Sequence, residues 1–161
     1  MWRLAMVMAL CPGWALAQED DKARLIGDWY EVAQTPTLLE QDCHGTTAKV
    51  AAREDTRLTL KIACRKGSLT GTILPIEGVL VETATAAFGL RLIQLSELGT
   101  INLVVLWQAP DDSMAAIGGT RGEVGWVWSK TPVPDPAGLA AARQALVTSG
   151  FRASAIRPVP Q

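Results

Sequence analysis

The sequence predicts a single all-β domain, an antiparallel sandwich or barrel, with one helix near its C-terminal end. Short apolar or alternating segments recur from residue 27 to residue 130, and Gly, Pro or acidic residues typical of hairpin turns separate them. No helical pattern interrupts this series, as expected for an antiparallel sandwich or barrel. The chain of 161 residues is long enough for one domain with a substantial core.

The first 17 residues predict a removable signal peptide. Arg3 precedes an apolar stretch, and Ala15-Leu16-Ala17 is a small-x-small cleavage signal. The apolar stretch is short for a bilayer span, and Pro12-Gly13 interrupts it. Two alternatives are an N-terminal membrane or core helix and a lipid anchor at Cys11. The predicted mature domain is therefore 18–161, with no stable membrane span.

The strand predictions follow the turn residues along the chain. The expected strands are 28–34, 45–53, 57–65, 69–74, 77–83, 88–94, 100–107, 114–118 and 124–130.

The two cysteines of the predicted mature chain, Cys43 and Cys64, are expected to form a disulfide. Exported domains fold in oxidising compartments, and only one intramolecular pairing is available. If 45–53 and 57–65 form a hairpin, the two cysteines lie nearly opposite each other, close enough for the bond. Closing a loop of this size should stabilise the fold by roughly 3 kcal/mol.

One helix is predicted between Asp135 and Gly150. Asp135 suits the N-cap, Pro136 the first helical position and Gly150 the residue after the end. Apolar residues recur at helical spacing between them, which predicts one apolar face. Residues 153–158 are expected to return as a short last strand.

The residues Gly27-Asp28-Trp29-Tyr30-Glu31-Val32-Ala33 resemble the signature of the lipocalin family at the start of its first strand. The segment Gly125-Trp126-Val127-Trp128-Ser129-Lys130-Thr131-Pro132 resembles the last barrel strand of the bacterial branch of that family, and Glu77-Gly78 also resembles a pair found in that branch. The resemblance covers roughly residues 25–160. It implies an eight-stranded up-and-down antiparallel barrel with one C-terminal α-helix packed outside.

The resemblance also implies structural roles for Gly27, Trp29, Tyr30 and Lys130. An indole can fill one end of a barrel, and Lys130 stands where the family has an arginine over that indole. Lysine can still make a cation–π contact with Trp29, although it lacks the planar fork of arginine. The family's middle motif, an Asp followed by an aromatic residue, is absent from the turn at 109–112.

Alternation along the strands gives a prediction for the wall of a ligand cavity. Side chains of the second strand that share a face with no lysine should point inward. The alternative is that each such residue is ordinary core. The predicted lining residues are Thr46, Ala48, Val50, Leu103, Val105, Trp107, Trp126 and Trp128.

The sequence argues against several kinds of chemistry. The net charge of −1 without a basic cluster argues against a nucleic-acid partner. The one histidine, His44, stands beside Cys43, but a disulfide accounts for the cysteines better than a thiol catalyst or a zinc site does. We therefore expect no enzyme activity, metal or cofactor.

The function predicted is that of an exported protein, periplasmic or secreted, which binds or transports a fatty acid, lysophospholipid or similar ligand in the barrel lumen. One alternative is an isomerase of a lipid-derived substrate, which needs titratable side chains buried together in the lumen. Lys130, Arg91 and a few threonines are its only candidates. Another is a protein-interaction module with a filled barrel and an exposed apolar patch.

Overall fold

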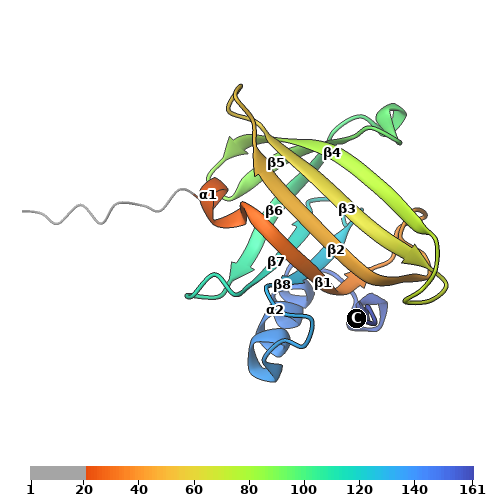
Figure 1. The fold of residues 1–161 in the computed structure, drawn as a ribbon. Coiled ribbons are helices and arrows are strands. Elements are labelled where there is room, and N and C mark those ends of the chain that lie inside the picture. The colour runs from red at the N-terminus through yellow and green to blue at the C-terminus, as the bar shows by residue number, and fades with distance from the viewer. Residues whose placement is uncertain (1–20) are drawn as a thin grey trace, which may run out of the picture.

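The computed structural model describes residues 21–161, in which eight strands form one closed antiparallel barrel (Figure 1). Each strand pairs with the next along the chain, and β1 pairs with both β2 and β8, which closes the barrel. The predicted up-and-down barrel with one helix outside it is confirmed. The barrel strands are β1 (Gly27–Thr35), β2 (Cys43–Ala52), β3 (Leu58–Lys66), β4 (Ile73–Ala84), β5 (Ala87–Leu92), β6 (Ile101–Gln108), β7 (Met114–Gly119) and β8 (Gly125–Ser129).

Two α-helices flank the barrel. The short helix α1 (Asp21–Leu25) lies at one end, and α2 (Pro136–Thr148) packs outside the barrel against β6, β7 and β8 (Figure 1). Asp135 caps α2 as predicted, since its Oδ2 accepts a hydrogen bond of 2.8 Å from the backbone N–H of Gly138. The remaining elements are the 3-10 helices η1 (Ser96–Leu98) and η2 (Ala153–Ala155) and the strand β9 (Arg157–Pro158), which pairs with β1.

The predicted signal peptide and Cys11 lie outside the described residues. Within residues 21–161, no helix has the length and apolar character needed to cross a membrane.

The prediction of two separate strands at 69–74 and 77–83 is wrong, because β4 runs unbroken through Pro75. The carbonyl of Pro75 faces away from β3 and accepts a hydrogen bond of 3.1 Å from the side-chain amide of Gln94. The backbone nitrogen of a strand residue points to the same side as its carbonyl, so the missing N–H of Pro75 removes no bond to β3. Proline is tolerated at this position for that reason.

Two apolar clusters stabilise the fold, one inside the barrel and one between the barrel and α2. The inner cluster is built from inward-facing side chains of all eight strands, with Leu25 of α1. The outer cluster joins Val32 and Ala33 of β1 to Ala142 and Leu146 of α2. A β-bulge between Glu31 and Ala33 turns two consecutive β1 side chains outward toward the helix.

Candidate functional site

One end of the barrel is closed by the residues of the first-strand signature. Trp29 is 1% exposed, and its indole N–H donates a hydrogen bond of 2.9 Å to the carbonyl of Leu25. The ammonium nitrogen of Lys130 lies 3.5 Å from the centroid of the Trp29 ring, at cation–π distance. A Cβ at Gly27 would come within 2.9 Å of that nitrogen, and the φ of +133° also favours glycine there. Tyr30 points to the outer cluster instead.

Three indoles then fill the half of the barrel nearest this closed end. The ring centroids of Trp29 and Trp128 are 6.2 Å apart, and those of Trp126 and Trp128 are 5.7 Å apart with nearly parallel planes. The column therefore leaves room for a ligand only beyond Trp126, toward the opposite, open end.

A cavity of about 230 Å³ occupies the open end of the barrel. Its walls are mainly aliphatic, and Trp126 lines it at the end of the indole column. We call it the mouth cavity. It is lined by Thr37, Leu38, Leu39, Glu40, Ile62, Ile76, Leu92, Leu95, Leu98, Ile101, Glu123, Val124 and Trp126.

Exposed apolar side chains lie at the open end of the barrel, and two of them, Leu38 and Leu98, line the mouth cavity. They come from the three segments that join β1 to β2, β3 to β4 and β5 to β6 at this end, and from the first residue of β4. The alternative function as a protein-interaction module requires both an exposed apolar patch and a filled barrel. The open end has exposed apolar residues, but side chains fill only the closed half of the barrel. These exposed residues are Leu38, Leu69, Ile73, Ile93 and Leu98.

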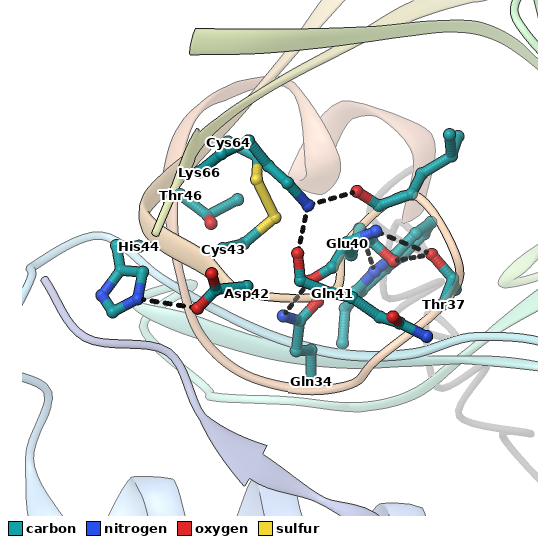
Figure 2. Close-up of a disulfide and its surroundings, with 12 residues drawn as sticks. Gln34, Thr37, Glu40, Gln41, Asp42, Cys43, His44, Thr46, Cys64 and Lys66 are labelled. Carbon is teal, nitrogen blue, oxygen red and sulfur yellow. Dashed lines mark hydrogen bonds and ion pairs between the residues drawn. A yellow bond between two sulfur atoms is a disulfide. The ribbon is translucent and has the colours of Figure 1, made fainter. Parts of the chain in front are cut away.

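The loop between β1 and β2, residues 36–42, carries Glu40 into the barrel. The Glu40 carboxyl accepts a hydrogen bond of 2.9 Å from the indole N–H of Trp126 and another of 2.8 Å from the hydroxyl of Thr37. The side-chain amide of Gln34 on β1 donates a bond of 3.1 Å to the Glu40 carbonyl (Figure 2). The loop is thereby fastened to two strands, β1 and β8, and its carboxyl group forms part of the cavity wall.

The predicted disulfide between Cys43 and Cys64 is confirmed, with the two Cα atoms 5.2 Å apart. A β-bulge between His44 and Thr47 shifts the β2–β3 register and brings the two cysteines together. Beside the disulfide, the ammonium group of Lys66 donates hydrogen bonds to the carbonyls of Leu39 and Gln41 (Figure 2). The disulfide and Lys66 therefore hold the 36–42 loop from the β3 side.

Replacing both cysteines, in Cys43→Ser/Cys64→Ser, is expected to lower the free energy of unfolding by about 3 kcal/mol, because the unfolded chain regains its freedom. Urea unfolding followed by circular dichroism measures this loss. Wild-type protein kept fully reduced serves as the matched control and should lose a similar amount. A double variant as stable as the oxidised wild type would contradict the stabilising role of the bond.

Glu31 is a second acid inside the barrel. Its side chain is fully buried, cross-strand from Trp128, and neither carboxyl oxygen has a hydrogen-bond partner among residues 21–161. Burial, followed by the charge of Glu40, raises the pKa of Glu31 well above its ordinary value, and the nearby indole N–H of Trp128 lowers it in part without reaching full hydrogen-bond geometry. Burial likewise raises the pKa of Glu40, against the lowering effect of Thr37 and Trp126. The lumen thus holds two interacting carboxyl groups.

Most of the predicted lining residues face the lumen, but only one of them reaches the mouth cavity. Trp126 lines that cavity, while the other predicted residues that face the lumen are not part of its lining. Thr46 is fully buried, and its hydroxyl has no partner in the part of the chain that the structure describes. The inner cluster contains Ala48, Val50, Leu103, Trp126 and Trp128, with Val105 packed against it.

The placement of Trp107 in the lumen is wrong. A β-bulge between Val105 and Trp107 shifts the pairing of β6 with β7, so strict alternation fails at this point. Trp107 packs in the outer cluster near α2. It lines a groove of about 640 Å³ on the barrel's outer surface together with Met114 and Gly138.

Sequence reasoning missed both lumen acids. Glu31 lies two positions after Trp29, so alternation on β1 could have placed it inside; Glu40 is in a loop that has no periodicity to read. The candidates named for an isomerase do not converge, since Lys130 sits at the closed end and Arg91 is exposed. His44 contacts Asp42 at 3.3 Å, and the described residues contain no group of three potential metal ligands.

Comparison with known proteins gives one matching family and several similar structures. The model of the lipocalin-like domain family matches residues 21–161. No curated protein matches the sequence.

The similar structures include lobster apocrustacyanin A1, with 14% identity and a TM-score of 0.67 over 89% of this chain and 81% of that one. The cockroach allergen Per a 4 has 17% identity and a TM-score of 0.64, over 86% of this chain and 87% of that one. The siderocalin Ex-FABP, described as having dual ligand specificities, has 15% identity and a TM-score of 0.62 over 86% and 95% of the two chains. At these identities the similarity shows a shared fold.

Proposed function

This chain belongs to the lipocalin family, and we propose that it binds a small apolar or amphipathic molecule in the mouth cavity. The family fold is typical of proteins that bind or transport small hydrophobic ligands. The observation that carries the proposal is the cavity itself: a hollow inside the barrel with aliphatic walls and a few polar groups, which is the usual composition of a small-molecule site.

The size of the cavity limits the ligand. At about 230 Å³ it is below the roughly 300–1,000 Å³ usual for drug-sized ligands. One ring system or a short chain fits this space. A full-length fatty acid or lysophospholipid, the ligand expected from the sequence, would require the 36–42 loop to move away from β8.

We also propose that the protein is exported and works in the periplasm or as a secreted protein, after removal of residues 1–17. The Cys43–Cys64 disulfide supports an oxidising compartment. The segments at 77–78 and 125–132 support a place in the bacterial branch of the family.

Binding is tested with a panel of one-ring and short-chain molecules that includes neutral, cationic and anionic members, followed by tryptophan fluorescence. We expect saturable binding of some members and at least a tenfold loss in Ile62→Phe, because a phenyl ring projects into the cavity from its wall. Ile26→Phe is the matched control, since Ile26 is 38% exposed beside α1 at the other end. A panel in which no member binds saturably would overturn the proposal.

A second candidate function is acid–base isomerisation, which the two lumen acids favour. Glu40 lines the cavity and Glu31 interacts with it, so a carboxyl group with a raised pKa is within reach of a bound molecule. A small β,γ-unsaturated ketone offers the test. Conversion to the conjugated ketone by the wild type and none by Glu40→Gln would support catalysis, and no conversion by either would exclude this reaction.

A further inference from the structure

The mouth cavity has an unusual balance of charge for a site expected to take a fatty acid. Two of its lining residues, Glu40 and Glu123, carry carboxyl groups, and its lining contains no Lys, Arg or His. Glu123 is paired with Arg121, whose Nε lies 2.9 Å from the Glu123 Oε1. Lys66 directs its ammonium group at backbone carbonyls of the 36–42 loop. The ionisable side chains that line the mouth cavity therefore present negative charge to a ligand.

Glu40 in particular lacks a cationic partner among the interactions of the described chain. Its two donors, the Trp126 indole and the Thr37 hydroxyl, are neutral groups. Each carboxylate oxygen has a second lone pair, so the group can accept further hydrogen bonds. Buried carboxylates are normally paired with a cation or strongly hydrogen-bonded, which leaves Glu40 incompletely compensated.

Glu31 gives independent support from deeper in the lumen. Its carboxyl group is fully buried and has no hydrogen-bond partner within residues 21–161, and the charge of Glu40 raises its pKa. A positive charge beside Glu40 would favour the ionised form of these carboxyl groups, which burial disfavours. A ligand carboxylate would disfavour that form further.

From these features we propose that the mouth cavity selects an apolar amine, whose ammonium group lies beside the Glu40 carboxylate and the Trp126 ring. The ammonium donates hydrogen bonds to Glu40, and the electron-rich face of an indole also attracts a cation. The apolar part of the ligand packs against Ile62, Ile76 and Ile101. This inference rests on the proposed function, because it names the chemical class of ligand for the same cavity.

Heptylamine, heptanol and heptanoate test the inference at neutral pH, because they share a chain and differ in the charge of the head group. Isothermal titration calorimetry should give an affinity at least tenfold higher for heptylamine than for heptanol, with heptanoate the weakest. The comparison uses the wild-type protein, so it does not depend on any variant folding.

The variant Glu40→Gln should abolish the amine preference, so that heptylamine and heptanol bind to the variant with affinities within about threefold of each other. Glu97→Gln is the matched control, because Glu97 is exposed on the open-end segment that contains η1 and does not line the cavity. Its amine preference should be that of the wild type.

The outcomes separate the two proposals. Heptanol binding as tightly as heptylamine would overturn the amine inference and leave the proposed function standing. An amine preference that survives Glu40→Gln would overturn the role of Glu40. If none of the three molecules binds and the wider panel also fails, the proposed function falls together with the inference.

Discussion

Trp29→Ala is expected to lower the free energy of unfolding by about 3–5 kcal/mol, as large-to-small changes at fully buried aromatic residues do. The indole is 1% exposed and stands first in the column of three that fills the closed half of the barrel. Its removal leaves a cavity, frees the Leu25 carbonyl of its hydrogen bond and takes away the ring beneath Lys130. Urea or guanidinium unfolding of the mature protein measures the loss.

Trp107→Ala provides the matched control for this prediction. Trp107 packs at the edge of the outer cluster and is only partly buried, so its removal creates a smaller void and should cost less. If Trp29→Ala were no more destabilising than Trp107→Ala, the indole would not be acting as the plug of the closed end.

Glu31→Gln is expected to be more stable than the wild type at neutral and higher pH, and equally stable near the ordinary pKa of a glutamate. Burial and the charge of Glu40 raise the pKa of Glu31 well above the ordinary value of 4.5. Between those two pKa values the folded protein holds a proton that the unfolded chain has released. Wild-type stability therefore falls as pH rises through this window, with a slope of up to about 1.4 kcal/mol per pH unit from this one group.

Glutamine cannot ionise, so the free energy of unfolding of the variant lacks the decrease with rising pH that Glu31 causes in the wild type. Unfolding curves recorded in steps from about pH 4 upward give the comparison. Glu97→Gln, which changes an exposed glutamate, should follow the wild-type curve. A Glu31→Gln curve parallel to that of the wild type across the whole range would show that Glu31 ionises as an exposed carboxyl group does.

The barrel could be predicted from the sequence because its signals are local. Turn residues at regular intervals delimit the strands, the Trp29 signature lies where the first strand begins, and Asp135 caps the helix. The disulfide was predictable because the hairpin brings Cys43 and Cys64 close together. These features depend on neighbours in sequence or on one hairpin.

The errors arose where a local rule gives way to pairing between strands. Alternation places Trp107 inside, but the bulge after Val105 turns it outward. Pro75 predicts a strand break, yet β4 continues through it. Its carbonyl faces away from β3 and accepts a hydrogen bond from the side-chain amide of Gln94. Both outcomes are decided by a partner strand or side chain that the segment itself does not specify.

The candidate site was only partly predictable for a similar reason. Alternation on β8 places Trp126 and Trp128 together in the lumen, as the structure has them. The mouth cavity also depends on the 36–42 loop, which brings Glu40 back over the barrel. No periodicity in that loop indicates its path. The sequence therefore predicts neither the position of Glu40 inside the barrel nor the volume of the cavity beside it.

The indole N–H resonances of the four tryptophans in 21–161 test binding in the lumen most directly, because each indole lies in a different part of the barrel. Trp126 lines the mouth cavity, Trp128 and Trp29 lie progressively nearer the closed end, and Trp107 lines the outer groove. On titration with heptylamine, we expect the largest shift at Trp126, a smaller one at Trp128, and none at Trp29 or Trp107. A shift confined to Trp107 would put the ligand outside the barrel and contradict binding in the lumen.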